Sequence, residues 1–139
     1  METTLQGLVA WYESLTPQSV ARAAEFYAPD ATFEDPFNAV QGVAAIERIF
    51  HHMFAQVSEP RFKVSGVYRG DDGAMLRWQF HFRRGKTPVV VEGCSHLHFD
   101  PKGQVCSHVD YWDPAKPLFM GLPVIGALLR ALYRRVSAG

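Results

Sequence analysis

Hydrophobic residues in the first 60 positions recur at helical spacing. A first helix is predicted from apolar side chains at i, i+3, i+4 and i+7, namely Leu5, Leu8, Val9 and Tyr12. Thr16 can cap a second helix, Pro17 suits its first position, and it should end near Pro29. Its expected buried positions are Val20, Ala23, Ala24 and Tyr27. A third helix should follow Gly42, with its core positions at Ile46, Ile49, Phe50, Met53 and Val57.

From Pro60 onward the pattern changes to residues that alternate between two faces, as in strands. Tight turns at "GDDG" and "DPKG" separate the strands, which predicts an antiparallel meander of four strands, at 61–70, 74–85, 89–99 and 104–113. A shorter strand at 31–35 should precede the third helix. The tail 118–136 reads as a last amphipathic helix, with apolar positions Leu122, Ile125, Leu129, Leu132 and Val136. One α+β domain spanning 1–139 is the simplest organisation.

Strand alternation predicts which side chains face the helices. On 74–85 the apolar face carries Leu76, Trp78, Phe80 and Phe82. On 89–99 the better inward set is Val91, Gly93, Ser95, Leu97 and Phe99. The last strand is ambiguous, because one face holds His108, Asp110 and Trp112 and the other Ser107, Val109 and Tyr111. In the short strand, a carboxylate shares a face with apolar neighbours, the set being Ala31, Phe33, Asp35 and Phe37.

Composition narrows the class of protein. Of the 139 residues, 47% are hydrophobic and 20% charged, which is typical of a globular chain. Lys and Arg balance Asp and Glu at 14 each, which argues against a nucleic-acid binder. Cys94 and Cys106 form no CxxC pair, and we find no signal peptide and no apolar run long enough to span a membrane. We therefore expect a cytoplasmic protein with reduced thiols.

The segment "YAPDATFEDPF", residues 27–37, resembles the corresponding segment of ketosteroid isomerases and their relatives in the nuclear transport factor 2-like (SnoaL-like) superfamily. "LHFDPKGQV" and "DYW" extend the resemblance, which covers residues 5–113 and leaves out the tail. It implies a curved, mainly antiparallel sheet wrapped around N-terminal helices, forming a cone with an internal pocket. The predicted C-terminal helix would be an addition to that fold.

The resemblance also suggests roles for individual residues. Asp35 matches the isomerase general base, and Tyr12 matches the tyrosine that donates a hydrogen bond to the substrate oxyanion. Ser95 stands where those isomerases have a second donor, a protonated aspartic acid, so steroid isomerisation itself is in question. His108 and Asp110 form an alternative acid/base centre, because relatives use such groups from comparable strands. The expected ligand-binding residues are Tyr27, Phe33, Phe50, Trp78, Phe80 and Trp112.

Each of these assignments has a structural alternative. Asp35 could simply end its strand by bonding the backbone of the Asp-Pro turn, His108 and Asp110 could be a packed pair, and Tyr12 could be a core residue. The other histidines, His51, His52, His81, His96 and His98, lack the spacing of a metal site. We expect neither a metal nor a cofactor.

The sequence therefore supports three hypotheses. The first is a cofactor-free isomerase, dehydratase or cyclase that uses a pocket carboxylate as base on an apolar carbonyl or hydroxylated substrate. The second is a binding module that holds an apolar small molecule without turnover. The third is an interaction domain with a filled pocket. In each case the polar outer face of the sheet suits a homodimer contact, and neither nucleic acid nor membrane is an expected partner.

Overall fold

The computed structural model describes residues 2–114, with the side chains of the first two of these residues left out. Helix α1 (Glu2–Glu13) is followed by a 3-10 turn, η1 (Ser19–Arg22), a short helix α2 (Ala23–Phe26) and strand β1 (Tyr27–Glu34). Strand β2 (Ala39–Gln41) leads into α3 (Val43–Gln56). The remaining strands are β3 (Ser58–Arg69), β4 (Gly73–Arg84), β5 (Thr87–Phe99) and β6 (Val105–Trp112). The predicted helix at 118–136 lies outside the described residues.

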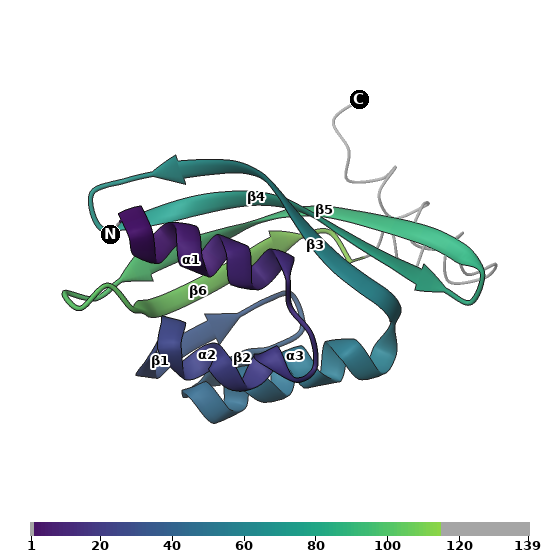
Figure 1. Cartoon of the computed structure of the whole chain (residues 1–139), viewed down its shortest axis with the longest axis horizontal. Coiled ribbons are helices and arrows are strands. Elements are labelled where there is room, and N and C mark those ends of the chain that lie inside the picture. Colours follow the sequence, from purple (N-terminus) through teal and green to yellow (C-terminus); the bar gives the residue numbers. More distant parts are fainter. Residues whose placement is uncertain (1, 115–139) are drawn as a thin grey trace, which may run out of the picture.

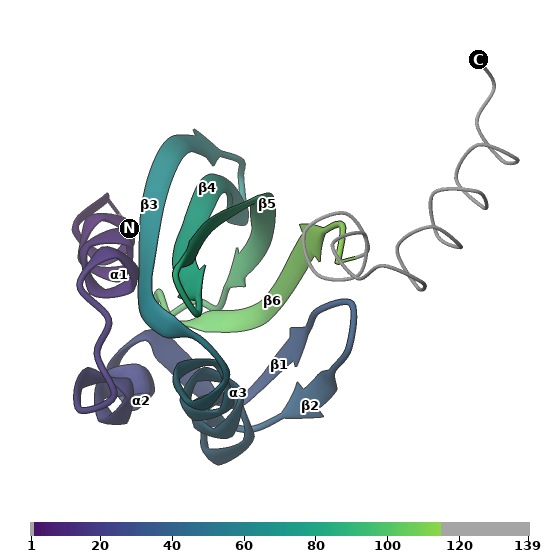
Figure 2. The same cartoon turned by 90° about the vertical axis from the view of Figure 1, so that its right-hand side faces the viewer.

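One six-stranded sheet organises the molecule, with the strand order β2-β1-β6-β5-β4-β3 (Figure 1). β3 to β6 form the predicted antiparallel meander, and β1 joins β6 in parallel while β2 pairs antiparallel to β1. The sheet is strongly curved, and α3 lies between the β3 side and the β1–β2 side (Figure 2). The α+β class and the curved sheet wrapped around helices are thus confirmed.

The N-terminal helices bury the apolar stripes that the sequence predicts. Leu5, Leu8 and Tyr12 of α1 are buried, as are Ile46 and Phe50 of α3. Trp11 lies among them, stacked on one aromatic ring and edge-on to others, and its Nε1 donates to the Ser19 carbonyl at 2.8 Å. These contacts fix α1 against the start of the second helical segment.

The second helical segment differs from its prediction. The Ser19 N–H donates to Thr16 Oγ1 at 3.0 Å, so Thr16 does stabilise the start of the segment, although the residue at the N-cap position of η1 is Gln18. The segment is only a 3-10 turn and one short α-turn, however, and Tyr27 begins a strand rather than ending a helix. Ala24 is exposed, so its predicted burial is wrong, because a segment this short presents Val20 and Ala23 to the core and little else.

Strand alternation is confirmed for the sheet. Leu76, Trp78 and Phe82 are buried on β4, whereas Arg77 is exposed on its other face. On β5 the inward assignment of Ser95 is correct, since that residue is only 4% exposed. The ambiguous last strand resolves through its register, because Ser95 lies opposite Asp110 and Leu97 lies opposite His108. The His108–Asp110–Trp112 face therefore looks inward.

Gly93 lets two strands and an indole lie close together. A Cβ on this residue would lie 2.6 Å from the Trp78 ring and 2.9 Å from the Tyr111 carbonyl oxygen. Only glycine leaves room for the Trp78 ring at this position on β5. In the described part of the chain, no helix is long and apolar enough to cross a membrane.

Candidate functional site

The inner side of the sheet and α3 enclose an apolar pocket with a volume of about 230 Å³. Most of its wall is aromatic or aliphatic, and the residues that line it include Phe33, Phe50, Phe62, Trp78, Phe80, Phe82, Val91 and Trp112. Two carboxylates, Asp35 and Asp110, interrupt this wall. Apolar walls with a few placed polar groups are typical of small-molecule sites.

A second, much smaller cavity of about 30 Å³ adjoins the first. The two share Phe50, Phe62, Trp78 and Asp110 as lining residues. The small chamber adds polar groups, because Tyr12, Ser95 and His108 line it together with Asp110. The pocket thus has an apolar body and a polar end, and Asp110 lies where the two meet.

Asp110 is held through one of its two oxygens. Its Oδ1 accepts a short hydrogen bond from Ser95 Oγ and lies 2.6 Å from His108 Nε2. Ser95 in turn accepts a hydrogen bond from Trp78 Nε1 at 2.9 Å. No described residue bonds Oδ2, and this oxygen is not sealed from solvent. One oxygen is therefore fixed in place and the other is free to meet a ligand.

His108 extends this network toward the helices. It is 3% exposed, and its Nδ1 lies 2.7 Å from the Tyr27 hydroxyl. Tyr27 is 2.5 Å from the Tyr12 hydroxyl, which is also 3.4 Å from His108 Nδ1. The imidazole stacks on the Tyr27 ring at 5.9 Å and packs on Phe33 at 4.6 Å. The ring has little freedom to turn.

Burial dominates the acidity of the two tyrosines. It raises the pKa of Tyr12 far above its usual range; the Tyr27 hydrogen bond opposes this shift, and the charge of Asp110 adds to it. Burial likewise raises the pKa of Tyr27, and the neighbouring Tyr12 and Asp110 raise it further. Both hydroxyls therefore keep their protons and can donate hydrogen bonds at any ordinary pH.

Asp35 has a different environment. Its Oδ1 accepts bonds from the backbone N–H groups of Phe37 at 2.8 Å and Asn38 at 2.7 Å, and from the Asn38 side-chain amide at 3.0 Å. The same amide reaches Oδ2 at 3.2 Å. Asp35 thus organises the turn after β1, as the structural alternative predicts, while it also lines the pocket.

The predicted site residues separate into three groups. The structure brings Tyr12, Ser95, His108 and Asp110 together at the small chamber, with Asp35 elsewhere on the larger pocket's wall. The expected ligand-binding residues Phe33, Phe50, Trp78, Phe80 and Trp112 line that pocket. Tyr27 is the exception, because it is fully buried, lines neither cavity and reaches the site only through His108.

Further residues line the pocket that were not predicted to bind a ligand. Phe37, Ile49, Met53, Val57, Phe82 and Val91 were predicted only to face inward or to lie in the core, whereas Asn38, His52, Gln56 and Phe62 were missed. The alternation of β3 could have indicated Phe62, and the helical spacing of α3 places Ile49, Met53 and Gln56 along one side. His52, one of the histidines given no role from the sequence, is exposed and also contributes to the pocket wall. Among the described residues, no cluster of three potential metal ligands exists.

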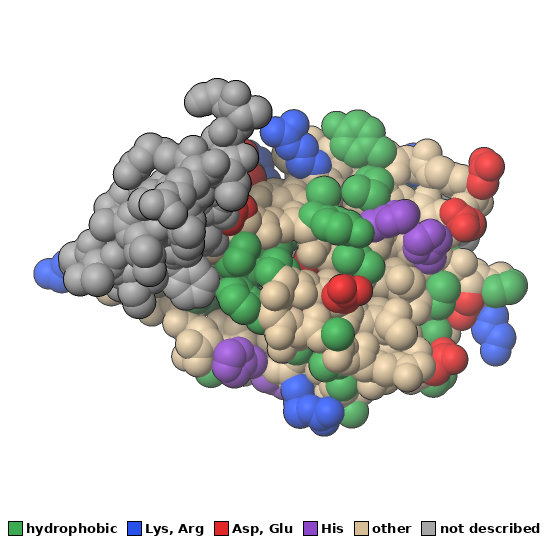
Figure 3. Space-filling view, turned by 180° about the vertical axis from the view of Figure 1, so that it is seen from behind, with side chains coloured by type: hydrophobic (Ala, Val, Ile, Leu, Met, Phe, Trp, Pro, Cys, Tyr) green, Lys and Arg blue, Asp and Glu red, His purple; other side chains and the backbone are tan. Residues whose placement is uncertain are grey.

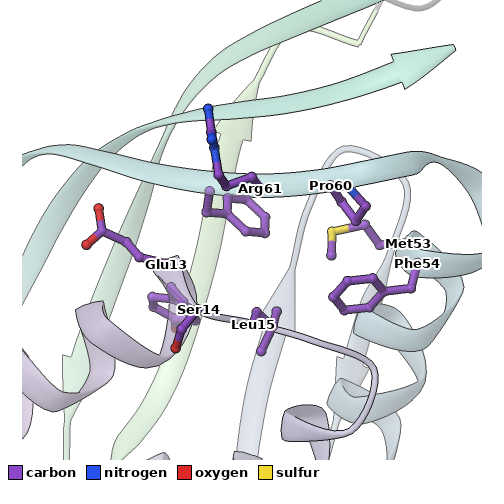
Figure 4. A pocket seen from close by; sticks show the side chains of 9 residues that line it. Glu13, Ser14, Leu15, Met53, Phe54, Pro60 and Arg61 are labelled. Carbon is purple, nitrogen blue, oxygen red and sulfur yellow. The ribbon is translucent and has the colours of Figure 1, made fainter. Parts of the chain in front are cut away.

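Another pocket, of about 240 Å³, lies where the ends of α1 and α3 meet the start of β3 (Figure 4). Tyr12, Met53 and Phe62 separate it from the inner cavities, since they line both. Among the described residues, the one carboxylate that lines this pocket, Glu13, accepts a hydrogen bond from the Val64 N–H at 2.9 Å. The Arg61 side chain points away from the pocket (Figure 4). This pocket lacks the linked acid/base groups of the inner site.

The described residues form a cone-shaped α+β fold that holds a carboxylate–histidine–tyrosine cluster in an apolar pocket. These features define a small α+β domain with an internal ligand pocket, and comparison with known proteins gives its family. The SnoaL-like domain family matches residues 8–108, so the chain belongs to the SnoaL-like family. A steroid Delta-isomerase of Nocardioides simplex is 34% identical over 118 residues, which cover 82% of this chain and 94% of that relative.

Solved structures agree on the fold. A protein with a ketosteroid isomerase-like fold from Catenulispora acidiphila, solved with trimethylamine, superposes with a TM-score of 0.70 at 17% identity, covering 83% of this chain and 88% of that one. A Shewanella putrefaciens protein named as a SnoaL-like polyketide cyclase gives 0.66 at 22% identity, covering 81% and 91%. These identities are low enough that the likeness concerns the fold alone.

Proposed function

We propose that this protein is a cofactor-independent acid–base enzyme of the isomerase or cyclase type, acting on an apolar carbonyl compound. The observation that carries the proposal is how the two carboxylate oxygens of Asp110 are hydrogen-bonded. One oxygen is fixed by His108 and Ser95, while no described residue bonds the other, and Asp110 lines both the apolar pocket and the polar chamber. A general base needs this combination of a fixed position and an open lone pair.

In the proposed reaction, the apolar part of the substrate fills the larger pocket and its carbonyl end enters the small chamber. Asp110 Oδ2 takes a proton from the carbon next to the carbonyl, and the electron pair of the broken C–H bond moves toward the carbonyl oxygen. Tyr12 stabilises the resulting enolate by hydrogen bonding. Asp110 then returns the proton to another carbon, which completes an isomerisation. In a cyclisation the enolate carbon instead attacks a second carbonyl, and Asp110 gives its proton to the alkoxide oxygen that forms.

The size of the pocket bears on the substrate. Drug-sized ligands occupy pockets of about 300–1,000 Å³, so 230 Å³ favours a smaller apolar ketone or one that protrudes from the mouth. The relative named as a steroid Delta-isomerase makes β,γ-unsaturated ketones the first compounds to test. Ser95 is assigned a supporting role here, because its hydroxyl donates to Asp110 rather than to the chamber.

The test compares two aspartates in one assay. With a panel of β,γ-unsaturated cyclic ketones, we expect Asp110→Asn to lower kcat by about 10²–10⁴-fold with little change in KM. Asp35→Asn is the matched variant, since it preserves the side-chain shape and an acceptor for the turn, and it should keep most of the activity. A loss confined to Asp35→Asn would reverse the assignment. Ketone binding without turnover by the wild type would instead support the binding module.

We also propose a homodimer through the outer face of the sheet. Tyr68 and Tyr111 are more than half exposed there, and with Met75 and Cys94 they border a surface hollow of about 380 Å³. Seen from behind, hydrophobic side chains gather in the middle of the surface with histidines beside them (Figure 3). An exposed apolar patch with a polar rim is typical of an interface between subunits.

A further inference from the structure

The base and the oxyanion donor of the proposed site are two ends of one row of hydrogen bonds. The row runs from Asp110 Oδ1 to His108 Nε2 at 2.6 Å, from His108 Nδ1 to the Tyr27 hydroxyl at 2.7 Å, and on to the Tyr12 hydroxyl at 2.5 Å. Every link is at or below the ordinary length of such a bond. No described group interrupts the row.

Only the two ends of this row face the polar chamber with free bonding capacity. Asp110 and Tyr12 line it, whereas Tyr27 lines neither cavity and both nitrogens of His108 are already bonded. A ligand can therefore touch the ends of the row and cannot touch Tyr27. A functional effect of the Tyr27 hydroxyl on the ligand has to pass through His108 or Tyr12.

The direction of the hydroxyl hydrogens depends on how many protons the Asp110–His108 pair holds. With one proton, on Nε2, the Nδ1 lone pair accepts from Tyr27 and Tyr27 accepts from Tyr12, so Tyr12 presents a lone pair to the chamber. With His108 protonated on both nitrogens, Nδ1 donates to Tyr27 and Tyr27 donates to Tyr12. The Tyr12 hydrogen then points into the chamber, where a carbonyl oxygen would lie.

We propose that this row is a proton relay that couples the base to the acid, a role that rests on the proposed function. The working state pairs the Asp110 carboxylate with a doubly protonated His108. As Asp110 Oδ2 takes the proton from the substrate carbon, Tyr12 gives its proton to the enolate oxygen. Tyr27 then supplies a proton to Tyr12, and His108 Nδ1 supplies one to Tyr27.

The relay conserves charge. The carboxylate and imidazolium before the step become a carboxylic acid and a neutral imidazole after it, and the substrate passes from ketone to neutral enol. Return of the proton from Asp110 to a different carbon draws the enol proton back along the row and restores the ion pair. No isolated charge remains in the apolar pocket at any stage, where it would be costly. Tyr27 acts here without contacting the substrate, and His108 acts through the bonds of its two nitrogens to Asp110 and Tyr27.

The test uses α-hydrogen exchange of 2-decalone, a saturated bicyclic ketone, in D2O. We expect Tyr27→Phe to slow the exchange by about 10²-fold without weakening ketone binding, and Tyr12→Phe, which also removes the donor that faces the carbonyl oxygen, to slow it at least as much. Because the Tyr27 hydroxyl acts only through the relay, the double variant should be no slower than Tyr12→Phe alone. Tyr111→Phe, on the outer face, is the control and should exchange as the wild type does.

The outcomes separate the relay from the proposed function. If the wild type does not promote exchange, the proposed function fails. If the wild type promotes exchange but Tyr27→Phe matches it, or the two single losses multiply in the double variant, the relay is wrong and Asp110 acts alone.

Discussion

Two aspartates at the same pocket show how much a side chain's bonding partners decide its chemistry. Asp35 accepts four hydrogen bonds from its own turn, which use both of its oxygens. One oxygen of Asp110 has no partner among the described residues. The other is fixed by His108, which lies on the same strand, and by Ser95 of β5. The first arrangement suits a turn, and the second suits a base.

The sequence could place both aspartates at the pocket but could not rank them. Alternation puts Asp35 beside Phe33, and the two-residue spacing puts His108 and Asp110 on one face. The hydrogen bonds that distinguish the two aspartates come from Asn38 to Asp35 and from Ser95 to Asp110. The bond from Ser95 depends on the register between β5 and β6. Register is a long-range property that a local pattern does not contain.

The buried tyrosines predict how stability depends on pH. In the unfolded chain Tyr12 and Tyr27 ionise near pH 10, whereas burial raises both pKa values in the folded protein. Their stabilising contribution is fully present below about pH 10, and it is lost as the pH rises further, because the unfolded state then binds fewer protons. Urea unfolding between pH 8 and 11 should show stability falling above pH 10.

A tyrosine variant isolates this effect. Tyr27→Phe should be less stable than the wild type at pH 8, because His108 loses a partner, but its stability should fall less steeply above pH 10. Tyr68→Phe is the control, since Tyr68 is 59% exposed, and it should follow the wild-type curve. Equal slopes for Tyr27→Phe and the wild type would contradict the account.

Among the elements, those with strong local periodicity were the predictable ones. α1, α3 and the four strands of the meander follow from spacing and turn residues, with boundaries that differ by a few residues. The second helix was predicted too long, and the start of β1 was missed, because Tyr27 and Ala28 are extended through pairing with β6. β2, three residues long, exists only as the partner of β1.

Packing between elements makes Gly93 a sensitive position. In Gly93→Ala the new methyl would meet the Trp78 ring and the Tyr111 carbonyl oxygen, so Trp78 has to move away from β5. We expect a loss of about 1–3 kcal/mol in the free energy of unfolding, measured with urea. Displacement of Trp78 should also weaken ketone binding, because Trp78 lines the pocket and donates to Ser95.

The matched control is Gly70→Ala. Its Cβ would have only an ordinary contact, 3.9 Å from the Gly73 carbonyl oxygen, so the change should stay within about 0.5 kcal/mol. If both alanine variants were equally stable and bound ketone equally well, close packing of Trp78 on β5 would not matter for the site.

For the whole molecule, curvature of the sheet creates the site. The inner faces of β4, β5 and β6 converge with α3 around the apolar pocket, and the polar cluster lines the small cavity beside it. That a pocket exists could be expected from the family resemblance, but its contents depend on how far Phe50, Phe62 and Trp78 fill it. A location in the cytoplasm stays a prediction.

The proposed dimer predicts a change in assembly. Tyr111→Arg places a charge in the exposed apolar patch of the outer face, where a second subunit would bury it. Light scattering coupled to size-exclusion chromatography should give a dimer mass for the wild type and a monomer mass for the variant. Arg48→Glu, on the exposed side of α3, changes charge away from this face and should stay dimeric. A monomeric wild type would exclude the dimer.

The central claim is that Asp110 exchanges protons with carbon in an apolar pocket. The most direct measurement is deuterium uptake by 2-decalone in D2O, followed by NMR, with the wild type, Asp110→Asn and Asp35→Asn at equal concentration. The account predicts rapid uptake with the wild type and with Asp35→Asn, and uptake near the protein-free rate with Asp110→Asn. Undiminished uptake by a folded, ketone-binding Asp110→Asn would contradict it.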